Sequence, residues 1–482
     1  MDRPLWTTSA IAAATGGQAQ AEVPVSSLSI DTRQLQPGAL FIALTDRRDG
    51  HDFVPQAFEA GAAAALVSRP VPGANGPLVQ VDDVLQALTE LALAARDRSA
   101  AVRVAITGSV GKTSVKDMLA AIFRAAGPAH WAEKSFNNHW GVPLTLSRMP
   151  QDTARAVFEI GMSTPGEIAP RARLVSPHHA LVTKIAPAHL EGLGTLEAIA
   201  DEKADIFAGL EAGGTLAVPA MDVFRDHLIA RGREYCAGAR IATFGASEGA
   251  DARVLDYTTD GLGSQVTLVV DGHRIAFGLR AVGAHWADNA AAAALLAVRS
   301  GVDPALAGEA LEGFGPSTGR GTAEAIPLPD GGTAWLVDDS YNANPESMGA
   351  ALAALGMRQG RRRLVALGEM LEVGGDPLAV HADLAGPMAE SGAEVAFLCG
   401  PAMQGLADAL PGTIQQRWAV KVEDLLEAVE NTLQDGDVLL IKGSNASRMG
   451  WLADRIRQTG ETARAGVMVS GAECSAKDGH DL

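Results

Sequence analysis

The chain has 482 residues, of which 57 are acidic and 39 are basic, so its formal net charge is −18 at pH 7. This acidic balance argues against nucleic acid as the main partner. The sequence contains no run of about 20 uncharged apolar residues that would predict a membrane span. Apolar residues make up 47% of the chain, as in globular proteins, and the length corresponds to roughly three domains.

The three cysteines, Cys236, Cys399 and Cys474, do not have the spacing of metal ligands. We therefore expect reduced thiols in a cytoplasmic protein. The first residues have no apolar core of the kind found in a signal peptide, which favours the same location.

Strand-like and helical segments alternate along the chain and predict an α/β fold with mostly parallel sheets. We expect a first domain at residues 1–100 and a second at 101–316. A glycine-rich joint at 313–321 leads into a third domain at 317–460. The polar residues 461–482 are expected to be a disordered tail.

The segment VRVAITGSVGKTS at residues 102–114 is typical of a phosphate-binding loop between a strand and a helix. Glycines allow backbone N–H groups to surround an anion, and a helix N-terminus adds its positive end. The general pattern would require glycine where Ile106 stands, so an ordinary glycine turn is the alternative. The residues expected at the phosphates are Gly108, Ser109, Val110, Gly111, Lys112, Thr113 and Ser114.

Two polar residues follow strands of the second domain. Glu159 ends the strand AVFEI, where a carboxylate is well placed to bind magnesium; a solvated carboxylate is the equal alternative. His189 follows the strand HALVTKI. A neutral imidazole there could be a ligand for a second metal, but a loop histidine that caps a helix fits the pattern equally well.

Lys203 lies on the apolar face of a predicted helix, because it shares one helical stripe with Leu196, Ile199, Ile206 and Leu210. The simpler interpretation is a lysine whose amine extends to solvent. The alternative is a buried and partly neutral amine. Such an amine can add carbon dioxide to form a carbamate, which is an anion able to bind a metal.

Several motifs together resemble the Mur ligases of peptidoglycan synthesis over about residues 26–455. They are TGSVGKTS, FNNHWGVPLTL, EIGMSTPGEI, APAHLEGLG, EKADIF, GAHWADNAAAA, the pair GR at 319–320, and DDSYNANP. The resemblance implies a central P-loop ATPase-type parallel sheet. A UDP-substrate-binding domain would precede it and a C-terminal Rossmann-like domain would follow.

The resemblance also implies roles for single residues around ATP. Lys112 would contact its phosphates, Asn289 the adenine, Arg320 the γ-phosphate and Asp339 the ribose. The implied magnesium ligands are Thr113 and Glu159 for one ion, and His189 and a carbamylated Lys203 for a second. The implied catalytic residues are Lys112, His189, Lys203 and Arg320.

On the substrate side, Asp31, Thr32 and Arg33 are expected near a uridine nucleotide, although a polar turn is the simpler interpretation. Asn137 and Asn138 match the substrate-side loop of the family. In contrast, Asn445 and Gly450 differ from the residues common in the family, so contacts to the second substrate are expected to differ there.

The activity implied is ATP- and Mg²⁺-dependent joining of D-alanyl-D-alanine to UDP-N-acetylmuramoyl-tripeptide through an acyl phosphate, by a cytoplasmic monomer. One alternative is a sister ligase with another acceptor, of Mur or folylpolyglutamate type. Another is a nucleotide-binding protein that performs no ligation.

Overall fold

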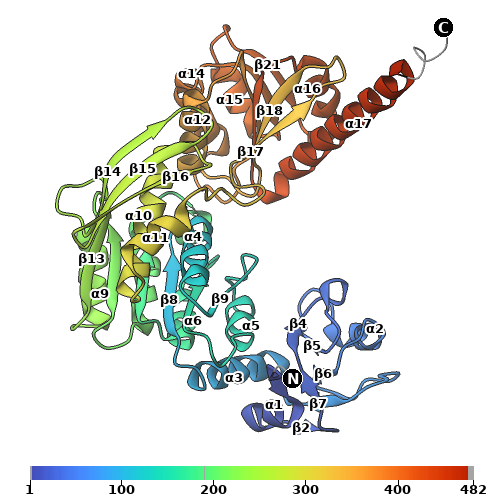
Figure 1. Cartoon of the computed structure of the whole chain (residues 1–482), viewed down its shortest axis with the longest axis vertical. Helices are drawn as coiled ribbons and strands as arrows, with labels where there is room; N and C mark the ends of the chain where they lie inside the picture. The colour runs from blue at the N-terminus through green and yellow to red at the C-terminus, as the bar shows by residue number, and fades with distance from the viewer. Residues whose placement is uncertain (1–2, 189, 476–482) are drawn as a thin grey trace, which may run out of the picture.

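The computed structural model describes residues 3–188 and 190–475. Its elements form three α/β units that follow one another along the longest axis, from the blue N-terminal unit to the orange and red C-terminal unit (Figure 1). The predicted α/β class is confirmed. Each main sheet lies within one of the expected domains, and the domain limits themselves stay a prediction.

The N-terminal unit contains a five-stranded sheet in the order β2-β7-β6-β5-β4, with β1 and β3 paired beside it. Its strands are β1 (Trp6–Thr7), β2 (Gln18–Ala19), β3 (Pro24–Val25), β4 (Ser27–Ser29), β5 (Ala39–Ile42), β6 (Ala64–Val67) and β7 (Leu78–Gln80). Its helices are α1 (Thr8–Thr15), the 3-10 turns η1 (Thr32–Gln34) and η2 (Gly50–Phe53), α2 (Val54–Glu59) and α3 (Val84–Asp97). Helix α3 leads toward the central unit (Figure 1).

The central unit is built on a nine-stranded sheet in the order β16-β15-β14-β13-β12-β11-β8-β10-β9. The strands are β8 (Val102–Thr107), β9 (Ala129–Trp131), β10 (Arg155–Glu159), β11 (His179–Val182), β12 (Thr215–Pro219), β13 (Arg240–Gly245), β14 (Ala252–Thr259), β15 (Ser264–Val270) and β16 (His273–Leu279). The helices are α4 (Lys112–Ala125), α5 (Gly141–Ser147), α6 (Ile168–Val175), α7 (Leu190–Leu193), α8 (Leu196–Ala204), η3 (Asp205–Gly209), α9 (Arg225–Tyr235), α10 (Ala284–Arg299) and α11 (Pro304–Leu311).

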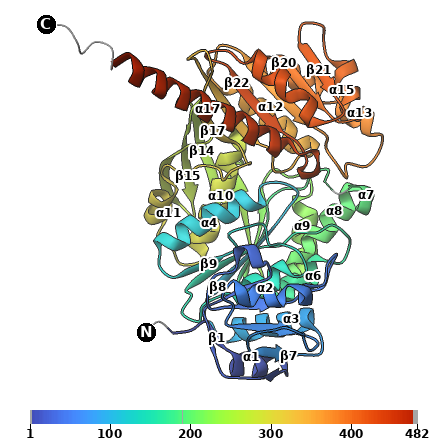
Figure 2. The same ribbon diagram turned by 90° about the vertical axis from the view of Figure 1, so that its right-hand side faces the viewer.

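Helices cover both faces of this sheet, which explains why its strands are continuous apolar runs. On β8, Val104 and Ile106 belong to the core under α4 and α10, whereas Ala105 belongs to the core under α6 and α8. Figure 2 shows α4 and α11 apart from α6 and α8, on opposite sides of the sheet. Strands β8 to β14 pair in parallel, and β15 and β16 extend the sheet by antiparallel pairing.

The C-terminal unit has a six-stranded sheet in the order β17-β18-β22-β19-β20-β21, parallel except for β17. Its strands are β17 (Thr322–Pro327), β18 (Thr333–Asp339), β19 (Arg363–Gly368), β20 (Ala393–Cys399), β21 (Gln415–Ala419) and β22 (Val438–Lys442). Its helices are α12 (Pro345–Met357), α13 (Pro377–Ala382), α14 (Ala385–Glu390), α15 (Met403–Ala409), η4 (Val422–Leu425), α16 (Leu426–Thr432), η5 (Asn445–Ser447) and α17 (Met449–Ser475).

Helix α17 differs from the expectation for the C-terminus. Disorder was expected from residue 461, but α17 continues to Ser475 and projects from the C-terminal unit (Figure 1). The physical reason is composition: strong helix formers such as Ala, Glu and Arg outnumber Gly and Ser in residues 461–475. The rest of the expected tail, residues 476–482, lies outside the described residues.

Two helical glycines of the C-terminal unit provide a matched test of its packing. A Cβ atom on Gly349 in α12 would meet no atom within 4 Å, whereas one on Gly405 in α15 would lie 2.1 Å from the carbonyl oxygen of Leu378. We expect Gly349→Ala to raise the free energy of unfolding by about 0.5–1 kcal/mol, since alanine favours a helix. We expect Gly405→Ala to lower it by about 1–3 kcal/mol through overpacking. Denaturant unfolding measures both, and equal effects would contradict the packing described.

Candidate active site

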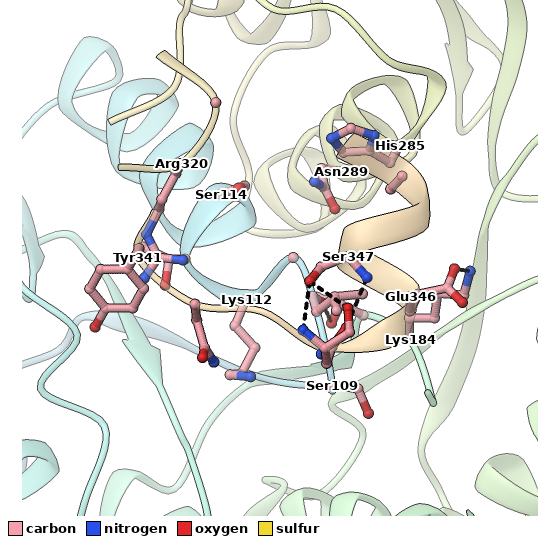
Figure 3. A pocket seen from close by; sticks show the side chains of 18 of the residues that line it. Ser109, Lys112, Ser114, Lys184, His285, Asn289, Arg320, Tyr341, Glu346 and Ser347 are labelled. Atoms are coloured by element: carbon pink, nitrogen blue, oxygen red, sulfur yellow. Dashed lines mark hydrogen bonds and ion pairs between the residues drawn. The ribbon is translucent and has the colours of Figure 1, made fainter. Parts of the chain in front are cut away.

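A cavity of about 810 Å³ lies between the central and C-terminal units. Parallel sheets bind ligands beyond the carboxyl ends of their strands, and this cavity is lined from two such edges. Segments that follow β8, β10, β11, β12 and β13 face segments that follow β18 and β22. Figure 3 shows the residues of this cavity, including Lys112, Arg320 and Asn289.

The predicted phosphate loop joins β8 to α4, the element order that favours this interpretation over an ordinary turn. Gly108 has φ +147° and Gly111 has φ +84°, conformations that L side chains rarely adopt. The hydroxyl of Ser109 donates to the carbonyl of Ala186 at 2.8 Å and accepts from its N–H at 3.0 Å. The loop is therefore fixed against the segment that follows β11.

Lys112 begins α4, and its Nζ donates to the carbonyl of Gly108 at 2.6 Å. The ammonium therefore curls back over the loop, where an anion would sit. Burial lowers the pKa of Lys112, Glu159 opposes this effect, and the positive charge of Arg320 adds to it. An anion bound in the loop would restore the stability of the charged form.

Glu159 is only 3% exposed and accepts two hydrogen bonds at the edge of the cavity. The hydroxyl of Thr113 donates to one carboxylate oxygen at 2.8 Å, and the amide of Asn137 donates to the other at 2.8 Å. The structure thus excludes the solvated carboxylate considered as an alternative. Two oxygen-bearing side chains, a hydroxyl and a carboxylate, meet beside the phosphate loop.

Lys203 is 2% exposed, so its amine does not extend to solvent. The residues expected on one helical stripe are divided between two elements, because α8 ends at Ala204 and the 3-10 turn η3 follows. Lys203 nevertheless lines the cavity. Burial lowers its pKa well below the usual value; the charge of Lys112 adds to this, and Glu202 opposes it.

Glu202, which precedes Lys203 in the sequence, hydrogen-bonds to other residues. Glu202 accepts hydrogen bonds from the backbone N–H groups of Gly166, Glu167 and Ile168 at 2.7, 2.9 and 3.0 Å. It therefore caps the start of α6. Within the described part of the chain, no hydrogen bond or ion pair involves the amine of Lys203.

Arg320 comes from the glycine-rich joint and connects two units. Its guanidinium lies 3.8 Å from the ring centre of Tyr341 and donates to the hydroxyl of Ser135 at 3.1 Å. Tyr341 and Ser135 also line the cavity, from the C-terminal and the central unit respectively. The arginine therefore faces the same space as Lys112, as Figure 3 shows.

Asp339 lies at the carboxyl end of β18, where Lys442 at the end of β22 donates to it at 2.7 Å. The same amine donates to the carbonyl of Asn342 at 2.9 Å. Burial raises the pKa of Asp339, and the nearby Lys442 opposes this effect. The carboxylate is thus held rigidly at the C-terminal wall of the cavity.

Asn289 lies on α10 with its side chain toward the phosphate loop. A Cβ atom built on Gly111 would be only 2.7 Å from the side-chain carbonyl oxygen of Asn289.

Two further contacts are found at the cavity. Lys184 of the central unit and Glu346 at the start of α12 form an ion pair (Figure 3). The side chain of Asn138 accepts from the N–H of Gly141 at 2.8 Å.

Most of the expected site residues share this cavity, but one group does not. Those that line it are Ser109, Val110, Gly111, Lys112, Thr113, Ser114, Asn137, Asn138, Glu159, Lys203, Asn289, Arg320 and Asp339. Asp31, Thr32 and Arg33 lie around η1 in the N-terminal unit and are not part of its lining; Asp31 and Arg33 pair at 2.8 Å.

The metal prediction stays a prediction. His189 lies outside the described residues. In the described ranges, 3–188 and 190–475, no group of three or more His, Cys, Asp or Glu side chains could hold a metal ion. Thr113, Glu159 and Lys203 nevertheless line one wall of the same cavity.

Sequence reasoning missed several cavity residues, including Ser135, Lys184, Glu346 and Lys442. The pairs Lys184–Glu346 and Lys442–Asp339 join segments that are 162 and 103 residues apart. One local signal could have located the start of α12, which carries Glu346. The spacing N-P-x-S is a recognisable helix start, and in the structure Asn344 and Ser347 form a reciprocal capping box there.

Models of known families match three segments of the chain. The Mur ligase family catalytic domain matches residues 24–96, the Mur ligase middle domain matches 106–297, and the Mur ligase glutamate ligase domain matches 327–445. Together they cover well over half of the sequence. The chain belongs to the Mur ligase family.

Individual members of the family support this assignment. The chain is 33% identical to the UDP-N-acetylmuramoyl-tripeptide–D-alanyl-D-alanine ligase of Bacillus subtilis over 432 residues, which are 88% of this chain and 92% of that one. MurF from Acinetobacter baumannii has a similar structure, with a TM-score of 0.81 and 28% identity over 94% of this chain and 99% of that one. The MurF ligase from Thermotoga maritima, solved in complex with ADP, shares the fold with a TM-score of 0.74 and 22% identity over 90% and 98% of the two chains.

The close fit of Gly108 provides a test of the phosphate loop. A Cβ atom there would lie 1.9 Å from the hydroxyl oxygen of Thr183, whereas one on Gly127, after α4, would meet nothing within 4 Å. We expect Gly108→Ala to abolish most binding of inorganic tripolyphosphate, because the loop must move. Gly127→Ala, which also has positive φ (+130°), should lose some stability through strain but keep its affinity. Calorimetric titration distinguishes them, and unchanged affinity in both variants would contradict the loop assignment.

Proposed function

We propose that this Mur ligase catalyses ATP-dependent formation of an amide bond between D-alanyl-D-alanine and UDP-N-acetylmuramoyl-tripeptide. The observation that carries the proposal is the cavity, in which a phosphate loop with Lys112 faces Arg320 from the joint to the C-terminal unit. The likeness to UDP-N-acetylmuramoyl-tripeptide–D-alanyl-D-alanine ligases over most of the chain supports this choice of substrates.

The proposed reaction has two steps. The terminal carboxylate of the tripeptide attacks the γ-phosphorus of ATP, which gives an acyl phosphate and releases ADP. The amine of D-alanyl-D-alanine then attacks the acyl carbon, a proton leaves the nitrogen, and inorganic phosphate is released from the tetrahedral intermediate. The first step brings two anions together, so the site must offset their repulsion.

Side chains of the cavity are suited to this task. Lys112 and Arg320 both supply positive charge to the cavity, and Arg320 is held in place by Tyr341 and Ser135. Preorganised cations and N–H groups favour the charge that develops on a transferred phosphoryl group. Asn289 and Asp339 would hold the nucleoside, and the Lys442 contact keeps Asp339 fixed.

The residues on the central wall fit a requirement for Mg²⁺. The hydroxyl of Thr113 and the carboxylate of Glu159 are hard oxygen donors that lie together beside the loop. The buried amine of Lys203 would add a second anion as a carbamate, with His189 as the remaining proposed ligand. When bound, Mg²⁺ would neutralise charge on the phosphates.

The first substrate would extend from this cavity toward the N-terminal unit. Asp31, Thr32 and Arg33 would take its uridine nucleotide, and Asn137 and Asn138 would contact the part nearer the cavity. We further propose a cytoplasmic monomer, a location supported by the use of ATP and by the free thiols of Cys236 and Cys399. No helix in the described residues has the length and apolar character needed to cross a membrane.

The direct test is incubation with ATP, Mg²⁺, D-alanyl-D-alanine and UDP-N-acetylmuramoyl-tripeptides that carry either lysine or diaminopimelate, with the products identified by mass. We expect a pentapeptide product and release of one phosphate per bond, and Lys112→Ala should give neither while remaining folded. Phosphate release that does not require D-alanyl-D-alanine would indicate a different acceptor or an ATPase without ligation.

Burial of Lys203 leads to a prediction about its modification. We expect Lys203→Ala to be folded and nearly inactive, and formate or acetate to restore part of the activity by filling the vacated anion site. A ¹³C resonance of a carbamate should appear when the wild-type enzyme is incubated with ¹³C-bicarbonate, and it should be absent from the variant. Rescue by small amines in place of carboxylic acids would contradict the carbamate.

A second prediction concerns Arg320, which we expect to act mainly on the reaction step. Arg320→Ala should lower kcat by roughly 100-fold or more, as the loss of a group that stabilises developing charge does. Its Kd for ATP in the absence of the other substrates should change little. Arg320→Lys keeps the charge and should be affected less. Equal losses in kcat and in ATP affinity would show that Arg320 is a simple binding residue.

A further inference from the structure

Arg358 is a buried cation for which the described part of the chain offers no acceptor. It follows the last residue of α12, is 6% exposed and lines the cavity. The other buried arginines of the two units behave differently: Arg103 donates to the carbonyl of Val175 at 2.8 Å, and Arg171 donates to that of Gly161. No hydrogen bond or ion pair from the guanidinium of Arg358 to any described residue is found.

Such a group is costly unless something supplies acceptors. A guanidinium carries five N–H donors and does not lose its proton in proteins. The nitrogens of Arg358 are not among the enclosed atoms without a partner, so they open to the cavity and take their acceptors from whatever occupies it. Burial lowers the pKa of Arg358, opposed only by Tyr257. Because Arg358 faces the cavity, a bound ligand is the natural source of acceptors.

The shape of the cavity near Arg358 restricts what that ligand can be. On α12, small residues line the approach to Arg358, namely Ala350, Ala351 and Ala354. At Ala354 the helix packs directly against the start of α10, because a Cβ atom on Gly283 would be 3.3 Å from the Cβ of Ala354. The three alanines present short apolar side chains to the cavity, a surface that suits the face of a flat ring better than a charged tetrahedral phosphate.

The position of Arg358 along the cavity points to the same kind of group. Figure 3 shows Ser347 and Glu346, at the start of α12, beside Ser109 and Lys112 of the phosphate loop. From Ser347 to Arg358 the helix rises by roughly 17 Å, at 1.5 Å per residue. A nucleoside triphosphate with its phosphates in the loop and its chain extended along α12 would bring its base to the Arg358 end.

We propose that Arg358 donates hydrogen bonds to the ring-nitrogen acceptors of the purine base of the bound nucleotide and is a specificity-determining residue of this site. The inference rests on the proposed function, because it takes ATP as the nucleotide. Arginine offers donors only, so it recognises the acceptor edge of a base.

The test compares nucleotide and phosphate binding by calorimetric titration. Arg358→Met removes the donors but keeps the length of the side chain, and Arg361→Met removes the same charge from an exposed position three residues later. We expect Arg358→Met to weaken ATP binding by about tenfold or more, as the loss of charged hydrogen bonds does. It should bind inorganic tripolyphosphate like the wild type, and Arg361→Met should bind both ligands normally.

A series of ATP analogues tests the contact in wild-type enzyme, so that the main result does not depend on whether Arg358→Met folds. In wild-type enzyme, at least one of 1-deaza-, 3-deaza- and 7-deaza-ATP should bind more weakly than ATP by a similar factor, and the difference should disappear in Arg358→Met. Equal binding of all analogues to the wild type would overturn the proposal. So would a parallel loss of ATP and tripolyphosphate affinity in Arg358→Met, which would make Arg358 a phosphate ligand. If wild-type enzyme does not bind ATP at all, the proposed function fails.

Discussion

The hydrogen-bonded register between β8 and its two neighbours determines where the active site forms. Glu159 of β10 pairs with Ile106, and Val182 of β11 pairs with Thr107. Glu159, the phosphate loop and Thr183 therefore leave the sheet at the same level. Because side chains alternate along a strand, a slip of one residue would move Glu159 to the other face and away from Thr113.

This register also decides which charges are buried together. Lys112, Lys203 and Glu159 meet in a chain with a net charge of −18, so the positive potential of the site is local. The fold keeps two nearby acids from neutralising this positive potential. Glu202 caps the start of α6, and Asp339 is paired with Lys442. The cations facing the phosphate loop are thereby left available for an anionic ligand.

The sequence predicted what depends on local signals. The strand, glycine loop and helix around Lys112 are read from consecutive residues, and the structure has them in that order. The antiparallel pair β15 and β16 went unrecognised, although Asp271 and Gly272, with φ +47° and +86°, form a two-residue turn typical of hairpins. For Lys203, periodicity indicated the apolar face, but only the three-dimensional packing shows that its amine is enclosed.

Contacts between units could not be predicted in the same way. Arg320 with Ser135, Lys184 with Glu346, and the unpaired Arg358 depend on how the C-terminal unit lies against the central one. No local pattern encodes that arrangement. The likeness to a family supplied Arg320, but it gave no indication of Arg358, whose significance lies in a missing partner.

The central claim is that the cavity brings the substrate carboxylate to the γ-phosphate of ATP, so that an acyl phosphate forms. The most direct measurement uses UDP-N-acetylmuramoyl-tripeptide with ¹⁸O in its terminal carboxylate and follows the isotope by mass spectrometry of the released phosphate. The account predicts that each ligation transfers one carboxylate oxygen to phosphate. Amide product formed together with unlabelled phosphate would contradict it.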